Sequence, residues 1–94
     1  MISVKKVRGR SMEPDLKDGD YIVVLSVFLK NIKVGHWIII DHPHYGRMVK
    51  QVCEINPQGY RVRGLSEHST DTLSLGLIIK EMIVGKVLFR ISGL

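Results

Sequence analysis

The 94-residue chain contains no alanine, a single cysteine and few aromatic residues: one Trp, three Tyr and two Phe. Without a second cysteine no intrachain disulfide can form, and branched aliphatic residues must build most of the core. Cys53 lies in an apolar strand pattern away from any motif, which predicts a buried structural thiol. A chain of this length has room for one hydrophobic core, so residues 1–94 are expected to form a single domain.

The sequence also lacks an apolar run long enough for a transmembrane helix, which needs about 20 residues. Its longest apolar region, from Leu73 to Ile91, is interrupted by Lys80, Glu81, Lys86 and Arg90. No apolar stretch follows the basic residues near the N-terminus, so a secretory signal is not expected. The chain is therefore expected to be soluble and cytoplasmic, with membrane association left open.

Charge and histidine content limit the classes of partner. Lys and Arg number 14 against nine Asp and Glu, a formal net charge of +5, which could attract nucleic acid, an anionic membrane or an acidic substrate. Proteins that bind single-stranded nucleic acid carry aromatic residues between their basic ones. This pattern is missing, so a nucleic-acid partner is not expected.

The four histidines come without a His-Glu-x-x-His motif or a cysteine pair. They are expected to be surface loop residues, with no metal and no other cofactor.

Short runs rich in Val and Ile recur along the chain, separated by Gly, Pro, Asn and Asp. The predicted strands are Ile2–Val7, Tyr21–Val27, Trp37–Asp41, Arg47–Ile55, Tyr60–Arg63, Leu77–Ile79 and Ile83–Ile91. Asn56 to Gly59 is typical of a hairpin turn. Helical periodicity is limited to one turn near Ser11–Leu16. The pattern predicts a mainly β fold, either a compact, mostly antiparallel sheet or a partly closed barrel.

Lys50 is the unusual residue of these strands. Alternation through the strand places it on the same face as Met48 and Val52. Burial on this apolar face would destabilise the charged ammonium and lower the pKa of Lys50, as a lysine general base requires. The alternative is a lysine at a sheet edge whose stem is covered while its ammonium reaches water.

A second segment with residues suited to catalysis runs from Gly9 to Asp20, between two predicted strands. A serine at the start of a tight turn, as Ser11 is here, can expose its hydroxyl beside aligned backbone N–H groups. That arrangement suits a nucleophile with an oxyanion site. Pro14 fixes the chain direction after the serine, and Gly19-Asp20 supplies a second turn. The same residues could equally form a capped helical turn.

Three segments together resemble the conserved boxes of signal peptidase I. Ser11-Met12-Glu13-Pro14-x-Leu16-x-x-Gly19-Asp20 is similar to the serine box and the Gly-Asp box that follows it. Arg47-Met48-Val49-Lys50-Gln51-Val52 is similar to the lysine box, and Ser69-Thr70-Asp71-Thr72-Leu73-Ser74-Leu75-Gly76 to the C-terminal box. The three occur in the family's order. The chain is thus identified as a member of the signal peptidase I and LexA-like serine peptidase clan, whose β fold agrees with the predicted strands.

The resemblance implies a Ser/Lys dyad, with Ser11 as nucleophile and Lys50 as general base. By matching position, Ser69 would orient Lys50 and Asp71 would support the loops of the site. Backbone N–H groups from Gly9 through Arg10 to Ser11 would bind the oxyanion, and Met12 completes the motif around the nucleophile. Because Gly9 stands where some members carry a serine, no side chain at that position can donate to the oxyanion.

The C-terminal box departs from the family pattern. The family's Gly-Asp-Asn appears as Gly64-Leu65-Ser66, one residue closer to Ser69, and Thr72 and Leu73 replace a serine and an arginine. An inactive relative acting as a binding module is therefore one alternative to the peptidase.

The implied activity is cleavage of a leader or pro-segment from a precursor protein in trans. The resemblance is greatest to short soluble members such as nickel-type superoxide dismutase maturation proteases, since only ten residues precede Ser11. A fragment of a self-cleaving LexA-like regulator is a further alternative. It is disfavoured because the chain lacks an Ala-Gly or Cys-Gly cleavage site. The expected partner is a precursor protein or peptide.

Overall fold

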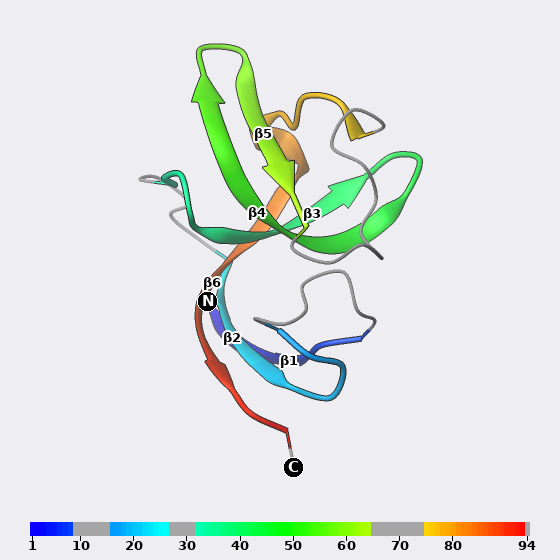
Figure 1. The fold of residues 1–94 in the computed structure, drawn as a ribbon, viewed down its shortest axis with the longest axis vertical. Coiled ribbons are helices and arrows are strands. Elements are labelled where there is room, and N and C mark those ends of the chain that lie inside the picture. The colour runs from blue at the N-terminus through cyan, green and yellow to red at the C-terminus, as the bar shows by residue number, and fades with distance from the viewer. Residues whose placement is uncertain (9–15, 27–31, 65–74, 94) are drawn as a thin grey trace.

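The computed structural model describes residues 1–8, 16–26, 32–64 and 75–93 (Figure 1). Its six strands come from the Val- and Ile-rich segments of the chain. They are β1 (Ile2–Lys6), β2 (Tyr21–Leu25), β3 (Trp37–His42), β4 (Gly46–Asn56), β5 (Gly59–Arg63) and β6 (Ile83–Ile91). A short 3₁₀ helix, η1 (Lys80–Met82), precedes β6. None of the helices in these four ranges is long and apolar enough to cross a membrane.

All six strands belong to one sheet in the order β1-β2-β6-β3-β4-β5. Each neighbouring pair is antiparallel, and the sheet is open, with β1 and β5 at its two ends. Figure 1 shows β1 and β2 at one end of the molecule and the β4–β5 hairpin at the other, with β6 passing between them. The mainly β, antiparallel fold expected from the sequence is confirmed.

Two hydrophobic clusters lie on opposite faces of the sheet, because β3 directs alternate side chains into each. Ile38 and Ile40 belong to cluster 1, which covers the β3–β4–β5 half together with Ile32, Val52, Val62, Leu75, Ile78 and Ile83. Ile39 belongs to cluster 2, which covers the β1–β2–β6 half with Val7, Leu16, Ile22, Val24 and Val87. The aliphatic composition of both clusters follows from the scarcity of aromatic residues.

The predicted strands agree with the observed ones except at one segment. Leu77–Ile79 was expected to be a strand, but only Ile78 pairs, in an isolated bridge with Tyr60, and the chain then turns into η1. Asn56 and Gly59 close the β4–β5 hairpin as predicted. The helical turn expected near Ser11–Leu16 lies outside the described residues, apart from Leu16 itself.

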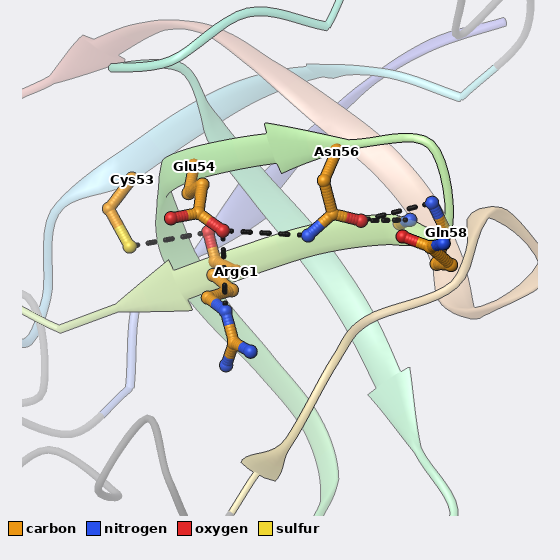
Figure 2. A network of polar contacts seen from close by, with 6 residues as sticks. Cys53, Glu54, Asn56, Gln58 and Arg61 are labelled. Carbon is orange, nitrogen blue, oxygen red and sulfur yellow. Dashed lines mark hydrogen bonds and ion pairs between the residues drawn. The ribbon is translucent and has the colours of Figure 1, made fainter.

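Polar contacts along the β4–β5 hairpin fix its turn (Figure 2). Asn56 Oδ1 accepts hydrogen bonds from the backbone N–H groups of Gln58 and Gly59, at 3.0 and 3.1 Å, an arrangement typical of Asx turns. The Glu54 carboxylate lies 3.4 Å from Nε of Arg61 on the facing strand.

The expectation of a buried Cys53 is wrong, because its side chain is exposed. The register shifts between Val52 and Glu54, so Cys53 occupies a β-bulge and lies outside the regular alternation. Its thiol donates a 3.4 Å hydrogen bond to the carbonyl of Arg61 (Figure 2).

Candidate active site

Lys50 is the most deeply buried charged side chain of the described residues, with only 1% of its surface exposed. It lies in β4, which pairs with β3 on one side and β5 on the other. Ile38 is its direct partner on β3, and Ile38 and Val52 are both members of cluster 1. The alternative of a lysine at a sheet edge is thereby excluded, and the predicted apolar neighbours are confirmed.

The burial of Lys50 changes its acid–base chemistry. Removing an ammonium group from water disfavours the charged form, and desolvation accordingly lowers the pKa of Lys50 below its ordinary value. A lower pKa increases the fraction of neutral amine near neutral pH. A neutral amine can accept a proton, so this residue meets the first requirement of a lysine general base.

The segment that carries the candidate nucleophile is anchored at both ends. Ser11 and its neighbours Gly9, Arg10 and Met12 lie outside the described residues. On either side of them, Val7 and Leu16 are buried in cluster 2. The N–H of Val7 donates to the carbonyl of Asp20 at 2.7 Å, and the N–H of Gly19 donates to the carbonyl of Val7 at 2.9 Å. These two hydrogen bonds hold Val7 next to Gly19 and Asp20, on either side of the segment that contains Ser11.

Asp20 fixes the second of these ends. Its Oδ2 accepts from the backbone N–H of Lys17 and its Oδ1 from that of Gly93, both at 3.0 Å, and Arg90 Nη1 lies 3.8 Å from Oδ2. The two backbone hydrogen bonds, assisted by Arg90 and Lys17, lower the pKa of Asp20. Its carboxylate therefore joins the turn before β2 to the chain after β6, a link that the sequence did not indicate.

The second candidate segment, with Ser69 and Asp71, also lies outside the described residues. The strand before it, β5, ends at Arg63, which pairs with Gln51, the neighbour of Lys50 in β4. After it, Leu75 is buried in cluster 1, on the face of β4 that holds Lys50. Arg63 therefore lies in the half of the sheet that contains Lys50, and Leu75 packs against that half.

His42 holds the Leu75 anchor, contrary to the expectation of a surface loop histidine. It ends β3 with its side chain buried. Its Nδ1 accepts from the N–H groups of His44 and Tyr45 at 3.1 and 3.4 Å. The proton of the neutral ring is then on Nε2, which donates to the carbonyl of Leu75 at 3.0 Å. Ile38, Ile40 and His42 occupy alternate positions of β3, so their side chains lie on the same face of the strand. This alternation was the sequence signal for the burial of His42.

The other histidines give a mixed outcome. His44 is exposed, as expected, whereas His36 is half-buried and accepts a hydrogen bond from the N–H of Lys33 at Nδ1; His68 lies outside the described residues. Within the described ranges, no three His, Cys, Asp or Glu side chains are grouped so that they could hold a metal ion.

Comparison with known protein families shows to which family this chain belongs. The sequence model of the family described as Peptidase S24-like matches residues 3–88. The chain belongs to the Peptidase S24-like family. No curated protein matches it. The matched range of this Peptidase S24-like chain includes Ser11, Lys50, Ser69 and Asp71, and membership confirms the resemblance to the LexA and signal peptidase I clan. At the level of the family, it indicates a peptidase type of activity.

Proposed function

We propose that this Peptidase S24-like chain is a serine endopeptidase that cuts a leader or pro-segment from a precursor protein in trans. Ser11 is the nucleophile and Lys50 the general base. The burial of Lys50 in an interior strand, with its pKa lowered, carries the proposal. Burying an ammonium group costs free energy. Buried ionisable residues with strongly shifted pKa values are found most often at functional sites, where the shifted pKa serves the reaction.

In the proposed mechanism, neutral Lys50 Nζ accepts the hydroxyl proton of Ser11 as Oγ attacks the scissile carbonyl carbon. Backbone N–H groups between Gly9 and Ser11 stabilise the oxyanion of the tetrahedral intermediate. As the peptide C–N bond breaks, the Lys50 ammonium gives its proton to the leaving amine. Lys50 then takes a proton from a water molecule as that water attacks the acyl carbon of the ester at Ser11. When the bond between this carbon and Ser11 Oγ breaks, the Lys50 ammonium returns the proton to Oγ and the second product leaves as the acid.

Two further residues have supporting roles in this proposal. The Ser69 hydroxyl accepts a hydrogen bond from Lys50 and orients Nζ toward Ser11. Asp71 supports the loop that carries Ser69. The anchors of that loop at Arg63 and Leu75, both beside the half of the sheet that contains Lys50, support this assignment.

The test is cleavage of a proteome-derived peptide library by the purified chain, with products identified by mass spectrometry. We expect cleavage at a restricted set of sequences, lost in Ser11→Ala and in Lys50→Met. Ser3→Ala and Lys33→Met are matched controls, since each changes the same residue type away from the site, and both should cleave like the unaltered chain. Equal cleavage by Ser11→Ala would overturn the proposal.

A further inference from the structure

One face of the β1–β2–β6 half of the sheet is apolar, and most of its large side chains are exposed, although Val23 at its centre is buried. Direct partners in an antiparallel pair point to the same side, so the rows Val4–Val23–Phe89 and Lys6–Tyr21–Ile91 share one face. It lies opposite cluster 2, because Ile22 and Val24 alternate with Tyr21 and Val23. We call it the outer apolar face and define it by its large exposed side chains Ile2, Val4, Tyr21, Phe89 and Ile91.

The exposure of this face exceeds what scattered surface residues explain. Ile2 and Val4 on β1 are 65% and 60% exposed, and Phe89 on β6 is 57% exposed. Tyr21, on the strand β2 between them, is 40% exposed, so the patch extends over three adjacent strands. Contiguous apolar patches of this kind mark interaction sites. Two aromatic rings, of Tyr21 and Phe89, add the side chains that most often anchor binding partners.

The outer apolar face is continuous with the position of Lys50. The register places Ile2 opposite Leu25, Leu25 opposite Lys86, Lys86 opposite Ile38, and Ile38 opposite Lys50. One row of side chains therefore crosses five strands on a single face, from the exposed patch to the proposed general base. A chain bound on the patch would be held on the same face of the sheet as the candidate site.

The charges of this face select the partner. Lys6 and Lys86 lie at its two ends, and no Asp or Glu occurs among its paired positions in β1, β2 and β6. The pKa of His36 is lowered, first by burial and then by the positive charges of Lys86 and Lys33. The charge of Lys86 therefore acts on neighbouring groups. Two copies packed through this face would bring like charges together, whereas an acidic partner would be attracted.

We propose that the outer apolar face is an exosite that binds an apolar segment with flanking acidic residues in the precursor substrate, beyond the bond that is cut. This inference rests on the proposed function, because it assigns that enzyme a substrate class. Apolar contact with Val4 and Phe89 supplies affinity, and Lys6 and Lys86 select acidic over basic segments.

Binding is tested without cleavage, using Ser11→Ala protein and short fluorescein-labelled peptides that alternate Leu with Glu, Leu with Lys or Ser with Glu. Fluorescence anisotropy should give a Kd about tenfold lower for the Leu/Glu peptide than for either other peptide, a difference that two or three modest contacts supply. Phe89→Ser and Val4→Ser should remove this preference. Ile55→Ser, at an exposed site on the β4–β5 hairpin, is the matched control and should keep it.

The charge and the link to cleavage are tested separately. Lys6→Glu with Lys86→Glu should reverse the preference toward the Leu/Lys peptide, whereas Lys80→Glu should not. Each of the three alternating sequences is then attached as a tail to a cleavable peptide, first at one end and then at the other. Compared with the other two tails, the Leu/Glu tail should lower KM about tenfold and leave kcat unchanged.

Four outcomes separate the possibilities. Binding of the Leu/Glu peptide without any peptidase activity would keep the exosite and overturn the proposed function. Cleavage that is indifferent to the tails and to Phe89→Ser would overturn the exosite alone. Preferential sedimentation with phosphatidylserine vesicles and no peptide preference would assign the face to membranes. A concentration-dependent dimer abolished by Phe89→Ser would assign it to a second copy.

Discussion

Lys50 and Ile38 are direct partners across β4 and β3, and both side chains are almost completely buried. A lysine in that position has its charged form destabilised by loss of water, while its neutral form fits among aliphatic neighbours. Much of the proposed chemistry follows from this pairing, because it converts an ordinary cation into a proton acceptor.

The first prediction concerns pH. Because only the neutral amine of Lys50 accepts a proton from Ser11, kcat/KM should rise as pH increases through the lowered pKa of Lys50 and then level off. Below that pKa the base is protonated and activity should fall tenfold per pH unit. Initial rates on a peptide substrate across the pH range measure this profile. A rate that falls as pH rises over the same interval would contradict the role of Lys50.

The second prediction concerns stability. The folded pKa of Lys50 lies below the ordinary value of 10.5, so the unfolded chain binds the proton more tightly and burial of Lys50 destabilises the fold at neutral pH. Lys50→Met should raise the free energy of unfolding by about 1–3 kcal/mol near pH 7. The gain should shrink as pH rises toward 10.5. Urea denaturation at several pH values tests this, with Lys33→Met as an exposed control that should change little.

A third prediction concerns Asp20. Its folded pKa is lowered, so its contribution to stability is fully present above the ordinary value of 3.8 and is lost as pH falls through the lowered pKa. Asp20→Asn should therefore reduce the melting temperature at neutral pH by several degrees, and less in strong acid. Differential scanning calorimetry at pH 7 and pH 2 gives both values. Glu81→Gln, at an exposed carboxylate, should leave the melting temperature unchanged.

His42 gives a fourth prediction. Its ring donates to the Leu75 carbonyl and accepts from the N–H groups of His44 and Tyr45. His42→Leu would remove the hydrogen-bond partner of the buried Leu75 carbonyl and of two partly buried N–H groups. It should lower the free energy of unfolding by about 1–3 kcal/mol. Chemical denaturation compares this variant with His44→Leu, whose side chain is exposed. Equal stability of the two variants would show that His42 does not anchor Leu75.

The sequence predicted the strands well because apolar alternation and turn residues are local signals. Six of seven predicted strands form, and Ile83–Ile91 has the predicted bounds. The error at Leu77–Ile79 has a tertiary cause: only Ile78 finds a partner, at Tyr60, before η1 begins. Cys53 was misplaced because a β-bulge, which depends on pairing with β5, interrupts the alternation.

The candidate site was predictable to a different extent. Alternation alone placed Lys50 beside Met48 and Val52, and the structure confirms its burial. What alternation could not show is which face of each half of the sheet is covered. Val4 and Phe89 resemble core residues in sequence, yet they lie on the face opposite cluster 2 and are exposed. Long-range partners such as Gly93 for Asp20 have no local signal either.

The dyad itself is tested most directly by a double-mutant cycle on cleavage of one peptide substrate. The measurement is kcat/KM for the unaltered chain, Ser11→Ala, Lys50→Met and the double variant. Nucleophile and base act as a unit, so each single variant should lose at least about a thousandfold and the double variant no more than either one. Full activity in Lys50→Met, or losses that multiply in the double variant, would contradict a Ser11–Lys50 dyad.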